Sequence, residues 1–108
     1  MELHLKYTNI EPVEDIKVYI QKRILPLEKL LLGVAEIHAW VEIGKITRHH
    51  KEGKIWYAEC QLQLPGKKSF RATATREDLF IAIDEVKNEL ERILRNSKEK
   101  YRNNLRKS

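Results

Sequence analysis

The hydrophobic periodicity of this chain switches between two residues and about 3.6 residues, and this switching constrains the fold more than any other feature of the sequence. Apolar and polar residues alternate in four short stretches, residues 3–7, 37–43, 56–64 and 70–74. Apolar residues recur at helical spacing in two further stretches, residues 16–31 and 79–93. Alternation predicts a strand with one buried face, and helical spacing predicts an amphipathic helix. The predicted order of elements is therefore β-α-β-β-β-α.

The predicted sheet has one apolar face that needs cover, and the two amphipathic helices can supply it. We therefore predict an α+β fold, a two-layer sandwich in which both helices cover one face of a four-stranded sheet. The 108 residues suit one domain, which we expect at 1–95, followed by a basic C-terminal extension at 96–108. The chain lacks a long apolar run and a basic-then-apolar start, so we expect no membrane partner and a cytoplasmic location.

The ends of the predicted helices are marked by capping residues and prolines. Asn9 is the predicted N-cap of the first helix and Thr75 that of the second, with Asp78 as the reciprocal acid of a capping box. Pro26 is predicted to kink or shorten the first helix. The apolar stripe of the second helix is expected to end at Ile93.

The formal net charge of +5 is concentrated in two segments. Residues 45–75 contain seven basic and two acidic residues, and residues 95–108 contain six basic and one acidic. Clustered positive charge attracts polyanions by releasing their counterions, which favours a nucleic-acid partner over a role in solubility alone. The acidic residues within the second helix are expected to serve solubility and i,i+4 pairing.

A basic hairpin connection, roughly residues 44–53, is flanked by aromatic residues. Its cations and one of its histidines are expected to add RNA contacts: Lys45, Arg48, His49, Lys51 and Lys54. Trp40 and Tyr57 fall on the open face of the predicted sheet. They are suited either to stacking on bases or to covering each other as a cross-strand pair.

The residues that serve catalysis are not assembled in this sequence. Cys60 lies in phase with the apolar side of its predicted strand, where a buried thiol is an inert small hydrophobe. The serines stand in no nucleophile motif, and the glycines form no phosphate-binding loop. We therefore predict no enzymatic activity, no cofactor and no small-molecule substrate.

Histidines are the remaining candidates for metal ligands. His49 and His50 are adjacent, with His38 or His4 as further ligands. Neighbouring side chains in a strand or loop point in different directions, and no cysteine or acidic residue stands at ligand spacing. Solvated histidines or phosphate contacts are favoured, and no metal site is predicted.

Three sequence segments resemble the ribosome hibernation-promoting factor family, also called ribosome-associated inhibitor or sigma-54 modulation proteins. The first helix contains Lys22-Arg23-Ile24-Leu25-Pro26-Leu27-Glu28-Lys29. Alternating residues at 58–64 are followed by Pro65-Gly66 and the small-residue strand 70–74. The second helix reads Glu77-Asp78-Leu79-Phe80-Ile81-Ala82-Ile83-Asp84 and then Glu89-Leu90-Glu91-Arg92-Ile93-Leu94. The order and spacing of these segments together carry the resemblance.

The resemblance implies a non-enzymatic translation regulator that occupies the channel of messenger and transfer RNA on the small ribosomal subunit. The positions that match the family's rRNA contacts are Lys22, Arg23, Lys29, Arg92, Arg95, Lys98 and Lys100. Glu89 stands where the family usually has lysine, and Lys87 is the expected substitute. The length implies the short form, which we expect to be monomeric off the ribosome. The residues themselves leave open a general binder of double-stranded RNA or a scaffold that associates through its open sheet face.

Overall fold

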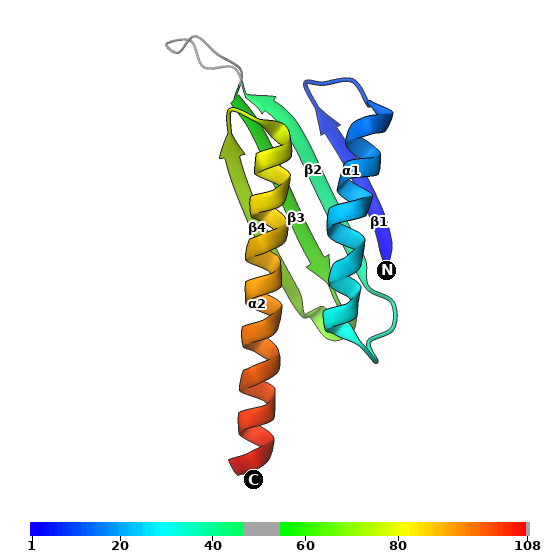
Figure 1. The fold of residues 1–108 in the computed structure, drawn as a ribbon. Coiled ribbons are helices and arrows are strands. Elements are labelled where there is room, and N and C mark those ends of the chain that lie inside the picture. The colour runs from blue at the N-terminus through cyan, green and yellow to red at the C-terminus, as the bar shows by residue number, and fades with distance from the viewer. Residues whose placement is uncertain (47–54, 108) are drawn as a thin grey trace.

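The computed structural model describes residues 1–46 and 55–107, the last ten of these by their backbone alone. It contains β1 (Glu2–Thr8), α1 (Glu14–Ile24), the 3-10 helix η1 (Leu25–Leu31), β2 (His38–Ile46), β3 (Ile55–Gln63), the short 3-10 turn η2 (Pro65–Lys67), β4 (Ser69–Arg76) and α2 (Leu79–Lys107). This order confirms the α+β prediction (Figure 1).

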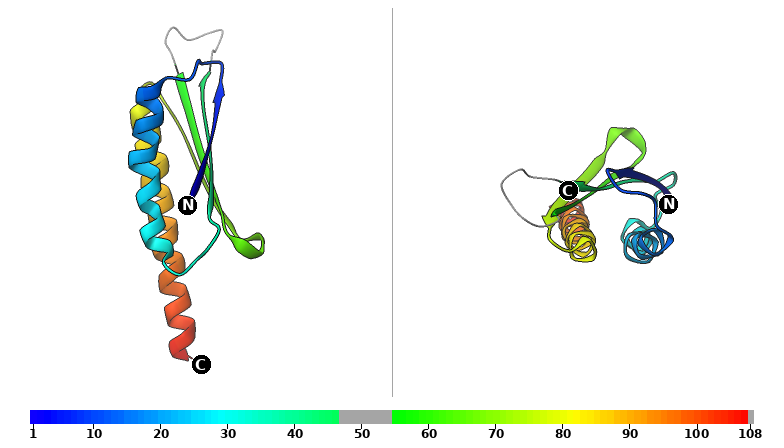
Figure 2. Two further views of the ribbon diagram at one scale, coloured as in Figure 1. Left: turned by 90° about the vertical axis from the view of Figure 1, so that its right-hand side faces the viewer. Right: turned by 90° about the horizontal axis from the view of Figure 1, so that it is seen from above.

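The four strands form one mixed sheet in the order β1-β2-β3-β4. The first two strands pair in parallel, and the other neighbours are antiparallel. Because parallel neighbours need a crossover connection, α1 must cross one face of the sheet between them. Figure 2 shows α1 and α2 side by side on that same face, so the other face of the sheet stays open.

The core lies between the sheet and the two helices. Cys60 and Leu62 of β3 are fully buried against it, as are Ile20 of α1 and Leu90 of α2. Burying a side chain of this size stabilises the fold by roughly 1.5–3 kcal/mol. The burial predicted for Cys60 is confirmed, and desolvation raises the pKa of its thiol to about 12, so the thiol is inert at neutral pH.

The buried stripe of α2 continues one residue further than predicted. Leu94 is buried, whereas Ile93 is only partly so. The reason is the helical period of 3.6 residues: Leu94, four residues after Leu90, faces the sheet again, whereas Ile93, three residues after it, stops short of a full turn. Beyond this point α2 extends past the end of the sheet (Figure 1), without a break at the predicted domain boundary.

The N-cap predicted for α1 was wrong. The helix begins at Glu14 after Val13, which offers no side-chain cap. Asn9 instead has a φ of 59°, and its Nδ2 donates to the carbonyl oxygen of Lys45 at 3.5 Å. The asparagine therefore shapes the turn after β1, a role for which its tolerance of positive φ suits it.

The N-cap predicted for α2 was wrong by three residues. The Oδ1 atom of Asp78 accepts hydrogen bonds from the backbone N–H groups of Phe80 at 2.8 Å and Ile81 at 3.2 Å. Thr75 is still in β4, paired with Tyr57. Because β4 extends further than predicted, the acid expected to be the reciprocal partner is itself the cap.

Pro26 shortens the first helix as predicted. The α-helix ends at Ile24 and continues as η1, with the proline in its first turn. A proline has no N–H to donate, so the chain leaves the α-helical hydrogen-bond pattern here. None of the helices in the described residues is long and apolar enough to span a membrane.

The predicted hairpin connection is shorter than expected at its start. Lys45, predicted to lie in the connection, is a residue of β2 opposite Trp56. Most of the predicted loop contacts lie outside the described residues: Arg48, His49, Lys51 and Lys54.

Candidate nucleic-acid interface

The two helices and η1 bring most of the predicted RNA contacts to one side of the molecule (Figure 2). Lys22 and Arg23 lie in the last turn of α1, and Lys29 lies in η1. The central part of α2 contributes Lys87, Arg92 and Arg95, and its distal part contains Lys98 and Lys100. We call the set without the distal pair the helical flank; it comprises Lys22, Arg23, Lys29, Lys87, Arg92 and Arg95.

Glu91 neutralises part of the helical flank. Its Oε2 accepts from Lys87 Nζ at 2.6 Å and its Oε1 accepts from Arg95 Nη2 at 2.8 Å. The two cations lie one turn before and one turn after the carboxylate, so one acid serves both. These hydrogen bonds lower the pKa of Glu91 to about 2. The i,i+4 pairing expected for the acids of this helix is confirmed here.

Glu89 forms the second pair on α2. Its carboxylate accepts from Arg92 Nη2 at 2.6 Å and from Arg92 Nε at 3.1 Å. The hydrogen bond from Arg92 holds the pKa of Glu89 below its ordinary value and raises that of the guanidinium. A guanidinium presents a planar fork that suits carboxylate or phosphate equally. Glu89 therefore occupies the edge of Arg92 that a phosphate would otherwise take.

Asp84 connects the two helices. Its Oδ1 accepts from the hydroxyl of Tyr19 at 2.6 Å and lies 2.9 Å from Arg23 Nε. The Arg23 N–H does not point at this oxygen, so that contact is an ion pair rather than a hydrogen bond. The bond to Asp84 raises the pKa of Tyr19, whose ring also meets Phe80 edge-on. Arg23 thus holds the helices together, in addition to its predicted RNA contact.

Two members of the helical flank stand apart from these pairs. Lys22 and Lys29 are exposed, and neither has a carboxylate within ion-pair distance among residues 1–46 and 55–97, whose side chains are described. They can meet a phosphate without first leaving a carboxylate. The side chains of the distal pair, Lys98 and Lys100, are not described.

The open face of the sheet contains an aromatic stack. The ring of Trp40, with 48% of the residue exposed, lies against that of His4, with centroids 3.9 Å apart and planes 13° apart. The alternative in which Trp40 and Tyr57 cover each other as a cross-strand pair is excluded, because Trp40 lies opposite Gln61 and Tyr57 lies opposite Gly44. The Tyr57 hydroxyl instead donates to Glu59 on its own strand.

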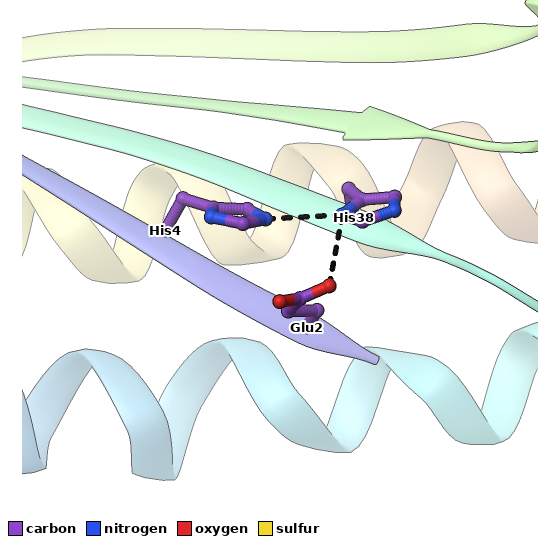
Figure 3. Close-up of side chains that lie close together, drawn as sticks. All are labelled: Glu2, His4 and His38. Carbon is purple, nitrogen blue, oxygen red and sulfur yellow. Dashed lines mark hydrogen bonds and ion pairs between the residues drawn. The ribbon is translucent and has the colours of Figure 1, made fainter.

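Next to this stack lies a cluster that the sequence analysis missed. Glu2, His4 and His38 bring one carboxylate and two imidazoles together where β1 pairs with β2 (Figure 3). Glu2 and His4 are two residues apart on β1, whereas His38 comes from the neighbouring strand β2, so only the pairing of the strands brings the acid to both imidazoles. The alternation that places all three residues on the open face was readable, but the parallel register Glu2↔His38 was not.

The fold resembles those of two solved structures. The N-terminal domain of Thermus thermophilus Protein Y superposes with a TM-score of 0.72 at 27% identity, covering 89% of this chain and 98% of that domain. A ribosomal subunit interface protein from Coxiella burnetii shares the fold, with a TM-score of 0.68 at 16% identity, covering 92% of this chain and 99% of that one. These likenesses define a class of small α+β domains.

The sequence model of the Sigma 54 modulation protein / S30EA ribosomal protein family matches residues 3–102, and the chain belongs to this family. The ribosome hibernation promotion factor of Lactococcus lactis is 27% identical over 91% of this chain and 50% of its own length. That of Deinococcus radiodurans is 25% identical over 86% of this chain and 47% of its own length, so the chain spans about half of these two relatives.

The ribosome hibernation promoting factor of Pseudomonas putida is 23% identical over 97% of this chain and 94% of its own length. The family and these relatives are named for ribosomes and their hibernation, not for an enzymatic activity. The resemblance found in the sequence is therefore confirmed.

Proposed function

We propose that this chain is a ribosome hibernation factor that binds the small ribosomal subunit in the channel of messenger and transfer RNA. Occupancy of that channel inhibits translation and preserves idle ribosomes in the cytoplasm under stress. One observation carries the proposal: the family match spans residues 3–102 and so includes all four strands and both helices, apart from Glu2 and the end of α2 beyond residue 102. The names of the relatives supply the link to hibernation, and the choice of subunit and channel follows the resemblance.

The helical flank is the proposed contact with rRNA. Its ion pairs indicate which of its cations are available to a phosphate and which are already held by a carboxylate. Lys22 and Lys29 meet phosphates directly, because no described carboxylate holds them. Arg92 has to give up its carboxylate before it meets a phosphate, so its contact is largely withheld while Glu89 is present. Arg95 shares Glu91 with Lys87 and can turn to a phosphate at a modest cost, since exposed ion pairs contribute little to stability. Arg23 keeps its pair with Asp84 and acts mainly by placing α1 against α2.

The distal lysines of α2 and the basic connection between β2 and β3 are proposed as further contacts. They comprise Lys98 and Lys100 in the distal part of α2, and Lys45, Arg48, His49, Lys51 and Lys54 in or beside the connection. Neutralising phosphates with fixed cations releases counterions, so affinity for the subunit should fall steeply as salt rises.

Cosedimentation with purified small subunits over a salt series tests the proposal. The variant Lys22→Glu/Lys29→Glu should bind more weakly and with a shallower salt dependence than the parent chain. Its matched control is Lys67→Glu/Lys68→Glu, which makes the same change of charge at exposed positions outside the helices. An equal loss in the control, or no binding by the parent chain at low salt, contradicts the proposal.

Competition with plain duplex RNA addresses the alternative partner. A duplex that competes as well as small subunits do indicates a general binder of double-stranded RNA, which reads A-form shape. Inhibition is tested separately by measuring whether small subunits loaded with this protein still accept messenger and initiator transfer RNA. Normal acceptance by loaded subunits refutes the proposed mechanism.

A further inference from the structure

The cluster of Glu2, His4 and His38 has the donor set of a zinc site. His4 Nε2 lies 3.0 Å from His38 Nδ1, and that same Nδ1 lies 3.3 Å from Glu2 Oε2. All three ligand atoms lie within 4.8 Å of one another. In Figure 3 the His4 ring and the Glu2 carboxylate both point at the His38 ring, on the face of the sheet opposite the helices.

We propose that these three residues bind one Zn²⁺ ion, with the fourth position open to water. Zinc takes imidazole nitrogen at about 2.0–2.1 Å and carboxylate oxygen at about 2.0–2.2 Å in tetrahedral geometry, so its ligand atoms stand about 3.3 Å apart. The two distances in the cluster already lie near that spacing. Two histidines and one carboxylate are a ligand set that zinc uses in proteins when one position stays open.

The present ring arrangement requires only a small change to hold the ion. The imidazole planes are 20° apart and their centroids are 5.2 Å apart. The facing nitrogens form an N–H···N hydrogen bond, in which one of the two carries the proton. Zinc binding replaces that proton, and the rings tilt until both lone pairs converge on the metal. All three side chains are at least partly exposed, so the tilt disturbs no core packing.

The backbone already fixes the spacing of the ligands. Glu2 and His38 are direct partners in the parallel register of β1 and β2, and His4 follows on the same face of β1. The ring of Trp40 stacks on that of His4 and restricts it, which lowers the entropy lost on binding. A bound ion would tie the edge strand β1 to its one neighbour. Because the site is on the face opposite the helices, its test is independent of the proposed function.

Isothermal titration calorimetry of chelator-treated protein with Zn²⁺ tests the site. We expect one ion per chain, and a rise in thermal midpoint on the order of 10 °C at a hundredfold excess over Kd. His4→Gln and His38→Gln should each weaken Zn²⁺ binding by more than about tenfold. In metal sites, the loss of a residue that only hydrogen-bonds to a ligand already costs about that much. Glu2→Gln should weaken it as well.

The matched control is His49→Gln/His50→Gln, which removes the other two histidines of the chain and should bind Zn²⁺ as the parent does. A second readout uses Trp40: Cu²⁺ at the site should quench its fluorescence, and Trp40→Phe should remove that quenching. Far-UV circular dichroism without metal establishes that each variant is folded. The proposal is overturned by an absence of Zn²⁺ binding, by unchanged affinity in any single ligand variant, or by loss of binding in the control.

Discussion

Glu89→Lys is expected to strengthen ribosome binding, because Glu89 holds the fork of Arg92. The substitution removes the carboxylate that pairs with Arg92 and adds a cation in its place, so two positive charges become available at this point of α2. Each further phosphate contact steepens the slope of log K against log salt by about 0.9 for a duplex. Two contacts steepen it by about 1.8.

The same slope gives the expected gain in affinity. At about 0.15 M salt, one further contact corresponds to about a fivefold gain and two to about a thirtyfold gain. Glu89→Gln frees Arg92 without adding a cation and should yield the smaller figure. The thermal midpoint should change little in both variants, because the pair is exposed to solvent.

Cosedimentation with small subunits at four or more salt concentrations gives both the affinity and the slope. Glu11→Lys is the matched control, since it makes the same change of charge at an exposed position in the turn before α1. We expect it to leave the slope within experimental error of the parent's. Glu89→Lys binding no tighter than the parent, or a control with an equal gain, refutes the assignment of Arg92 to phosphate.

Three further outcomes concern stability. Cys60→Ser should destabilise the fold by about 1–3 kcal/mol, because it buries a hydroxyl without a partner; chemical denaturation measures this, with binding per folded molecule unchanged. Asp84→Ala should lower the thermal midpoint by a few degrees, because Arg23 and the Tyr19 hydroxyl lose their shared partner. The low pKa of Glu91 makes its stabilising contribution complete above its ordinary pKa of 4.5 and lost as pH falls toward about 2. As pH falls from 4.5 to about 2, the thermal midpoint of Glu91→Gln should therefore decrease less than that of the parent chain.

The sandwich was predictable because its signal is periodic and repeated. Apolar and polar residues alternate in each strand, and apolar residues form a stripe along each helix. An error at one residue therefore shifts the predicted end of an element but does not change its type. The ends depended on tertiary context: β4 extends through Thr75 and leaves Asp78 to cap α2. No local residue preference reveals how far a neighbouring strand will pair.

The candidate sites differ in what the sequence revealed of them. The pairs of Lys87 and Arg95 with Glu91 follow from helical spacing and were expected in kind. The contact of Arg23 with Asp84 joins two helices, and the contact of Glu2 with His38 joins two strands. Both depend on how separate elements are placed, which residue spacing does not encode.

The distribution of charge along α2 leads to a last prediction. From Leu79 to Ser97 the helix has three basic and four acidic residues, whereas from residue 98 to 108 the chain has five basic and one acidic. Among the residues of α2 whose side chains are described, the last buried one is Leu94. A chain that ends after Ser97 therefore retains the described core and should fold with nearly the same thermal midpoint. If all five distal cations contact phosphate, the truncation should reduce the salt slope by about 4 to 5. A truncated chain that is folded and keeps the full slope would place the phosphate contacts on the helical flank and the hairpin connection instead.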